Sequence, residues 1–106
     1  SSLQRVLKMS GYRVVAVKDS AEALRLFERE PDEFDLIITD LTMPEMTGVE
    51  LTRKVQRIRP DMPVVLSTGF NDAISGQEAK SLGVRELLLK PVDTKELRKI
   101  VRRALE

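Results

Sequence analysis

The strongest constraint on the fold is a regular alternation between short extended runs and stretches with helical spacing. After an initial helical stretch at residues 3–9, an extended run precedes a helical stretch four times along the chain. The extended runs lie at 13–17, 36–40, 63–68 and 84–89, and the helical stretches at 19–30, 47–58, 71–82 and 93–105. Such alternation is typical of a parallel sheet with helices on both faces.

Capping residues mark the starts of three of these helices. Asp19, Thr47 and Asp93 are each followed three residues later by a glutamate, which is the pattern of a capping box. The stretch at 71–82 is the weakest helix, because Gly76 lies inside it and glycine costs about 1 kcal/mol relative to alanine. We interpret all three capping boxes as purely structural.

The run at 36–40 contains consecutive rather than alternating apolar residues, so we expect its strand to be buried on both faces. Because the alternation begins with a helix, the first strand of a doubly wound sheet is absent. In the flavodoxin-like order 2-1-3-4-5, that strand lies between the second and the third. The prediction is a flavodoxin-like α/β fold without its first, central strand, in which residues 1–106 form a single domain that is incomplete at its N-terminus.

Composition excludes several classes of function. The 106 residues carry a formal net charge of +1, which favours binding to neither nucleic acid nor an anionic membrane. The chain has no cysteine and no histidine, so its chemistry depends on carboxylates, hydroxyls and lysines. No apolar run approaches the roughly 20 residues that span a bilayer, and we expect a cytoplasmic segment that belongs either to a soluble or to a membrane-anchored protein.

Three residues that can handle phosphate follow three consecutive strands. Asp40 and Thr68 end their runs and Lys90 directly follows the last one, and the carboxyl ends of parallel strands meet at one edge of a sheet. A carboxylate can attack a phosphoryl group, while a hydroxyl and an ammonium can hold its oxygens. Each residue also has a plainer interpretation. Asp40 could be a turn residue, Thr68 could only bind the local backbone, and Lys90 could be a solvated surface amine. Their joint occurrence favours a phosphoryl site, with Gly69 leaving room for the group.

Two further features complete this hypothesis. Mg²⁺ is the expected cofactor, because a divalent cation normally bridges the carboxylate and phosphoryl oxygens. A cis peptide between Lys90 and Pro91 is a hypothesis that aims the lysine into the site.

The turn after Asp40 is distinctive. Residues 43–48 read Met-Pro-x-Met-x-Gly, and with Thr68 and the Lys90-Pro91 pair they make the chain resemble the receiver domain of two-component response regulators over nearly its whole length. The resemblance implies that Asp40 accepts phosphate from a histidine kinase or a phosphotransfer domain. Mg²⁺ is then held partly by Asp40 and by the backbone carbonyl of Thr42. The structural and switch positions that the family pattern marks are Pro44, Gly48, Gly69, Leu87 and Pro91.

The chain departs from the family pattern at two points. The acidic pair that supplies the other magnesium ligands after the first strand has no counterpart here. The Tyr or Phe switch residue three positions before the lysine is Leu87, so switching cannot use an aromatic rotamer. Residues 66–70 and 87–92 resemble receivers attached to hybrid sensor histidine kinases. A homodimer or strand exchange between copies stays open.

Two other functions compete with the phosphoacceptor. The missing acidic pair favours a pseudo-receiver that only binds partner proteins. A haloacid-dehalogenase-like phosphatase also uses a strand-end aspartate, but it needs a second aspartate where this chain has Thr42. We therefore expect at most self-phosphorylation and autodephosphorylation as enzymatic activity.

Overall fold

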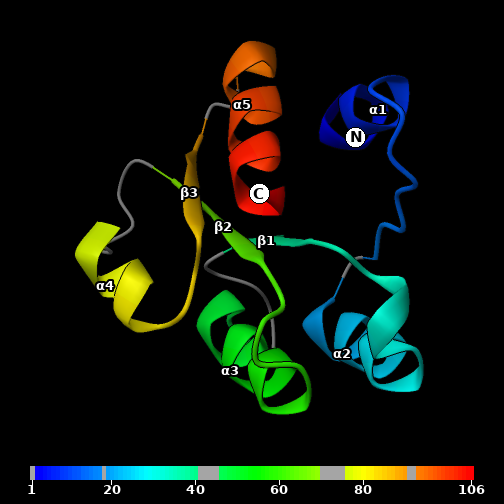
Figure 1. Cartoon of the computed structure of the whole chain (residues 1–106), viewed down its shortest axis with the longest axis vertical. Coiled ribbons are helices and arrows are strands. Elements are labelled where there is room, and N and C mark those ends of the chain that lie inside the picture. The colour runs from blue at the N-terminus through cyan, green and yellow to red at the C-terminus, as the bar shows by residue number, and fades with distance from the viewer. Residues whose placement is uncertain (1, 18, 41–45, 70–75, 91–92) are drawn as a thin grey trace.

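The computed structural model describes residues 2–17, 19–40, 46–69, 76–90 and 93–106 (Figure 1). These residues form five α-helices, one short 3-10 helix and three strands. In chain order they are α1 (Ser2–Met9), α2 (Ser20–Arg29), η1 (Pro31–Glu33), β1 (Ile37–Asp40), α3 (Gly48–Ile58), β2 (Val64–Thr68), α4 (Gly76–Ser81), β3 (Glu86–Leu89) and α5 (Thr94–Leu105).

The three strands form one parallel sheet in the order β1-β2-β3. Helix α3 connects β1 to β2, and α4 connects β2 to β3 (Figure 1). The register pairs Ile37 with Val64 at the start of β1 and Val65 with Glu86 at the start of β3. The predicted parallel α/β architecture is therefore confirmed for the strands that the structure describes.

Helices cover both faces of the sheet because successive strand residues point to opposite sides. Val65 and Leu88 pack with Leu7 of α1 and with the apolar face of α5. Val64 and Leu66 point the other way and pack with Ala79 of α4. A third cluster on that side joins α2 to α3 through Phe27, Leu51, Val55 and Met62. The core is thus built from two layers of helices around the sheet.

The predicted strand at 13–17 is wrong. Residues 12–17 form neither helix nor strand, although Val14 packs partly against the α5 cluster and Val15 is 63% exposed. A strand needs a neighbour for its backbone hydrogen bonds. In the predicted sheet order the neighbour of this run is the first strand of the fold, and the described residues contain no strand next to the run.

The expectation that the strand at 36–40 is buried on both faces is also wrong. Ile37 and Ile38 are only half-buried, and Thr39 is the buried residue of β1. The order of the described strands explains this result, because β1 lies at the edge of that sheet whereas all five residues of the central β2 are buried. An apolar sequence alone does not determine whether a strand has a neighbouring strand on each side.

Helix starts follow the predicted capping residues. Asp19 accepts a hydrogen bond from the Glu22 amide at 2.7 Å, and Thr47 accepts one from the Glu50 amide at 3.1 Å. Asp93 caps α5 through the Lys95 amide at 2.9 Å. Within the predicted helix at 71–82, the structure gives α4 from Gly76 onward, and residues 71–75 lie outside the described residues.

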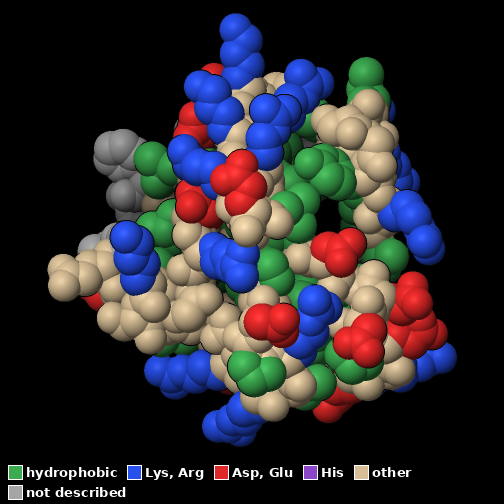
Figure 2. All heavy atoms as spheres, viewed as in Figure 1, with side chains coloured by type: hydrophobic (Ala, Val, Ile, Leu, Met, Phe, Trp, Pro, Cys, Tyr) green, Lys and Arg blue, Asp and Glu red, His purple; other side chains and the backbone are tan. Residues whose placement is uncertain are grey.

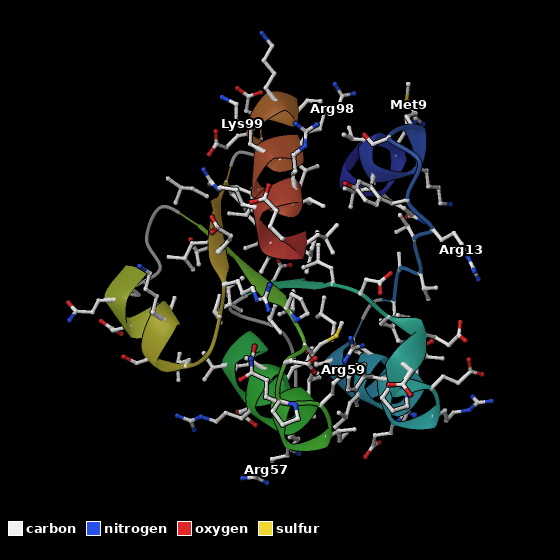
Figure 3. All side chains as sticks on the ribbon, in the orientation of Figure 1. Met9, Arg13, Arg57, Arg59, Arg98 and Lys99 are labelled. Carbon is white, nitrogen blue, oxygen red and sulfur yellow. The ribbon has the colours of Figure 1, made fainter. Side chains whose placement is uncertain are left out.

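The outer side of α5 carries a group of basic side chains, and Figure 2 shows Lys and Arg gathered over this helix. The exposed members are Lys95, Arg98, Lys99, Arg102 and Arg103. Figure 3 labels two of them, Arg98 and Lys99, on α5. Acidic side chains elsewhere balance this charge, since the formal net charge is only +1. None of the described helices is long and apolar enough to cross a membrane.

Candidate functional site

The carboxyl ends of the three strands lie level with one another. Asp40, the last residue of β1, pairs with Ser67 of β2, and Thr68 pairs with Leu89 of β3. The Lys90 amide donates a hydrogen bond to the Thr68 carbonyl at 2.9 Å, which continues the β2–β3 pairing past the end of β3. The register therefore brings Asp40, Thr68 and Lys90 to one edge of the sheet.

A salt bridge joins the two charged residues of this group. The Lys90 Nζ atom lies 3.0 Å from Asp40 Oδ1, and the two side chains are 47% and 45% exposed. An ion pair that is half in water contributes little to stability, because solvent screens it. The same exposure leaves the carboxylate open to an incoming reactant, so the pair is better suited to chemistry than to holding the fold together.

Gly48, the first residue of α3, lies against the backbone of Asp40. A Cβ atom at Gly48 would collide with the Asp40 carbonyl oxygen and would lie 2.8 Å from Leu66 Cδ2. Glycine is therefore required here by close approach to backbone. The Thr52 hydroxyl donates to the Gly48 carbonyl at 2.7 Å, a bond within the first turns of α3.

Two anchors that the sequence reasoning missed hold the segments around β1. The Ser20 hydroxyl donates to the Met46 carbonyl at 2.9 Å, and this bond joins the first residue of α2 to the segment just before α3. The Arg59 guanidinium, labelled in Figure 3, donates to the carbonyls of Pro31 and Phe34 at 3.0 and 2.6 Å. These contacts join residues 25 to 28 positions apart, and no local pattern in the sequence marks them.

The remaining predicted site residues divide into two groups. Leu87 is half-buried and packs against the Val64 and Leu66 cluster, and Gly69 is half-buried directly after Thr68. Thr42, Pro44 and Pro91 lie outside the described residues, and so does the peptide bond between Lys90 and Pro91.

The described donors do not fit a magnesium ion. Mg²⁺ prefers a set of hard oxygen ligands that usually includes more than one carboxylate or phosphate group. No group of three or more Asp, Glu, His or Cys side chains within the described ranges can hold a metal ion. Asp40 instead forms a salt bridge with the ammonium of Lys90.

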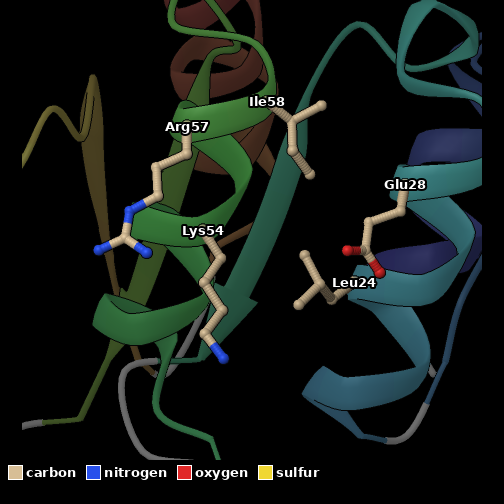
Figure 4. A pocket seen from close by; sticks show the side chains of 5 residues that line it. All are labelled: Leu24, Glu28, Lys54, Arg57 and Ile58. Carbon is tan, nitrogen blue, oxygen red and sulfur yellow. The ribbon is translucent and has the colours of Figure 1, made fainter.

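A separate hollow of about 280 Å³ lies between α2 and α3 (Figure 4). It is lined by Leu24, Glu28, Lys54, Arg57 and Ile58. None of the residues predicted to handle phosphate contributes to this lining, and its mixture of opposite charges and aliphatic groups selects no particular ligand.

Comparison with known proteins agrees with this geometry. The chain is 39% identical over 100 residues to the transcriptional regulatory protein GlrR of Escherichia coli (strain K12), a match that covers 94% of this chain but 22% of GlrR. It is 33% identical over 95 residues to the response regulator receiver protein CpdR of Brucella abortus (strain 2308), covering 90% of this chain and 78% of CpdR. The chain thus spans about a fifth of GlrR and most of CpdR.

Solved structures show the same fold. A response regulator receiver domain protein from Clostridium thermocellum superposes with a TM-score of 0.91 at 31% identity, covering 98% of this chain and 82% of that one. The family model for the response regulator receiver domain matches residues 1–102. Together with the strand-end geometry, these matches favour the receiver over the phosphatase alternative. The chain belongs to the family of response regulator receiver domains.

Proposed function

We propose that Asp40 is the phosphoacceptor of this receiver domain. The relatives of the chain are response regulators of two-component systems, in which a receiver takes part in signal transduction. The observation that carries the proposal is the 3.0 Å contact between Lys90 Nζ and Asp40 Oδ1 at the carboxyl edge of the sheet. An exposed carboxylate with an ammonium beside it is suited to attack a phosphoryl group and to hold the product.

The reaction balances with residues of this chain. A carboxylate oxygen of Asp40 attacks phosphorus, the bond from phosphorus to the donor's histidine nitrogen breaks, and that nitrogen keeps the electron pair. The product is an acyl phosphate, which water later hydrolyses to inorganic phosphate and the carboxylate. Lys90 offsets the negative charge of the phosphoryl oxygens, and the Thr68 hydroxyl donates a hydrogen bond to one of them.

Receiver domains generally bind Mg²⁺ for phosphorylation. In such a domain the ion would reduce the repulsion between the carboxylate and the phosphoryl oxygens. Because the described donors do not fit the ion, the roles above are assigned only to Asp40, Thr68 and Lys90.

The proposed partner is a histidine kinase or a histidine-containing phosphotransfer domain. The near-zero net charge of the chain gives no general attraction for nucleic acid, so DNA contacts are not assigned to this segment. Attachment to a hybrid kinase stays a prediction. GlrR, one of the relatives, is named as a transcriptional regulatory protein.

Phosphorylation is proposed to act through the face formed by α4, β3 and α5. The phosphoryl group draws Lys90 and Thr68 toward Asp40 and shifts an existing equilibrium between two conformations of this face. Leu87 lies on β3 within this face and packs into the cluster around Val64 and Leu66, so the change is one of aliphatic packing.

The test is phosphorylation of the full-length protein by acetyl phosphate and by a histidine kinase, followed on a phosphate-affinity gel. We expect Asp40→Asn to abolish the shifted band. The matched control is Asp35→Asn, which changes an exposed aspartate just before β1 and should leave the band unchanged. A shifted band of normal intensity in Asp40→Asn would show that another residue accepts the phosphate.

A function limited to protein binding is favoured by one observation, the lack of a metal-binding cluster within the described residues. A titration with beryllofluoride and Mg²⁺ separates the two functions. A phosphoacceptor site should give a saturable spectral change that Asp40→Asn removes. A receiver that only binds partners should give none.

A further inference from the structure

Ser67 has a buried hydroxyl with no hydrogen-bond partner in the described part of the chain. The residue is only 2% exposed. Buried hydroxyls in native proteins nearly always have a partner, and an unpaired one lowers stability. An alanine would fill almost the same space without this cost. We therefore expect the hydroxyl to have a hydrogen-bond partner in another state of the site.

Asp40 is the neighbour that can supply this partner. The Cα atom of Ser67 pairs with that of Asp40 on β1 and with that of Leu88 on β3. Leu88 packs against α5, and Ile38, two residues before Asp40, packs against the same cluster. Because side chains alternate along a strand, Asp40 and Ser67 point to this same face of the sheet.

The Lys90–Asp40 salt bridge spans the carboxyl end of β2. Asp40 ends β1 and Lys90 follows β3, while β2 runs between them. Neighbouring strands lie about 4.8 Å apart, so the lysine side chain must reach across the end of β2 to bring Nζ within 3.0 Å of Oδ1. Ser67 is the β2 residue that faces the same side.

Phosphorylation of Asp40 changes which hydrogen-bond donors are available to its carboxyl group. The ammonium of Lys90 is attracted to the phosphoryl oxygens, which carry more charge than a single carboxylate oxygen. The Asp40 carboxyl oxygen that Lys90 leaves then needs another donor. The unpaired hydroxyl of Ser67 lies on the adjacent strand in register with Asp40.

We propose that Ser67 is a positioning residue of the phosphorylation site. Its hydroxyl donates a hydrogen bond to the Asp40 carboxyl oxygen when Lys90 moves to the phosphoryl group. The bond holds the carboxyl group in line with phosphorus both when phosphate arrives and when water removes it. The proposal rests on the assignment of Asp40 as the phosphoacceptor.

The test compares Ser67→Ala, Ser67→Thr and the wild type in the full-length protein. Acetyl phosphate is the donor, and the rates of phosphorylation and of later hydrolysis are read from a phosphate-affinity gel. We expect Ser67→Ala to slow both rates about three- to tenfold, the range that one neutral hydrogen bond supplies. Ser67→Thr keeps the hydroxyl and should return both rates to within about twofold of the wild type. The control, Ser81→Ala, removes an exposed hydroxyl from α4 and should change neither rate.

Thermal unfolding separates positioning from packing. We expect Ser67→Ala to keep or raise Tm, because it removes an unpaired polar group from the core. Slower rates with an unchanged or higher Tm, restored by Ser67→Thr, support the proposal. Unchanged rates in Ser67→Ala overturn it, and so does a loss that Ser67→Thr does not restore. If the wild type itself gains no phosphate, the assignment of Asp40 fails first, which is a different outcome from a phosphorylated wild type that is indifferent to Ser67→Ala.

Discussion

The two ends of β2 are buried to nearly the same extent but carry different chemistry. Val64, Val65 and Leu66 are 0% exposed and pack between the two helical layers, whereas Ser67 and Thr68 are 2% and 4% exposed and adjoin Asp40 and Lys90. Burial alone therefore does not tell which residues stabilise the fold. What differs is the neighbour, which is a helix face for the amino end and a salt bridge for the carboxyl end.

This difference implies a division of effects along a single strand. Substitutions at the amino end should change the free energy of unfolding and leave the chemistry of folded molecules intact. Substitutions around the carboxyl end should do the opposite. Four changes follow in order of decreasing effect on stability, and the first and the last of them, Leu66→Ala and Lys90→Gln, test that division directly.

Leu66→Ala should give the largest loss of stability. The side chain is fully buried and packs with Val64, Ala79 and Val84, so its removal leaves a cavity. We expect a loss of about 2 to 5 kcal/mol in urea unfolding. The control is Leu89→Ala, whose side chain is 60% exposed and should cost well under half as much. If Leu66→Ala also slowed phosphorylation of the folded fraction, the proposed division along β2 would be wrong.

Gly48→Ala should come second and should affect both properties. The added Cβ meets the Asp40 carbonyl oxygen, and a backbone atom cannot rotate away as a flexible side chain would. We expect a loss of about 1 to 3 kcal/mol, the usual cost of overpacking, and slower phosphorylation because β1 shifts.

Gly11→Ala serves as the comparison for this change. Gly11 has a φ of 96° and open space around its Cβ position, so alanine there is strained by about 1 kcal/mol without a collision. Gly11 follows α1 and has no role in the proposed mechanism. Equal phosphorylation rates in Gly48→Ala and the wild type would show that the contact between Gly48 and the Asp40 backbone has no role in the site.

The sequence was sufficient to predict features that depend on local patterns. The capping residues Asp19, Thr47 and Asp93 depend on residues within one helical turn, and all three cap helices in the structure. The meeting of Asp40 and Lys90 was also predictable, because parallel strands align their carboxyl ends.

Features that depend on distant neighbours were not predictable in the same way. The β-branched run at 13–17 has the composition of a strand, but composition does not provide a partner strand. The apolar run that became β1 lies at a sheet edge for the same reason. The contacts of Arg59 with the Pro31 and Phe34 carbonyls, and the unpaired Ser67 hydroxyl, depend on how separate segments pack.

Thr47→Ala should cost less than either of the two larger changes. It removes the side-chain acceptor of the Glu50 amide at the start of α3, and loss of such a cap costs about 1 kcal/mol. Urea unfolding of Thr47→Ala and of Thr47→Ser, which keeps the hydroxyl, measures this effect. A loss of the same size in Thr47→Ser would show that the methyl group, rather than the cap, stabilises the helix start.

Lys90→Gln should have the smallest effect on stability and a large effect on phosphorylation. The Lys90–Asp40 pair is half-exposed, so its loss should change the free energy of unfolding by less than about 1 kcal/mol. In the proposed mechanism the ammonium holds the phosphoryl oxygens, and we expect phosphorylation by acetyl phosphate to slow by about tenfold or more.

The matched control is Arg103→Gln, because the Arg103–Glu86 salt bridge has the same length of 3.0 Å and also lies at the surface. Both substitutions remove one positive charge and one ion pair, so their effects on stability should agree to within about 0.5 kcal/mol. Only Lys90→Gln should slow phosphorylation, since Arg103 pairs with the first residue of β3, at the opposite end of that strand from Lys90. Equal slowing in both variants would mean that net charge attracts the donor, and the 3.0 Å contact with Asp40 would then have no specific role.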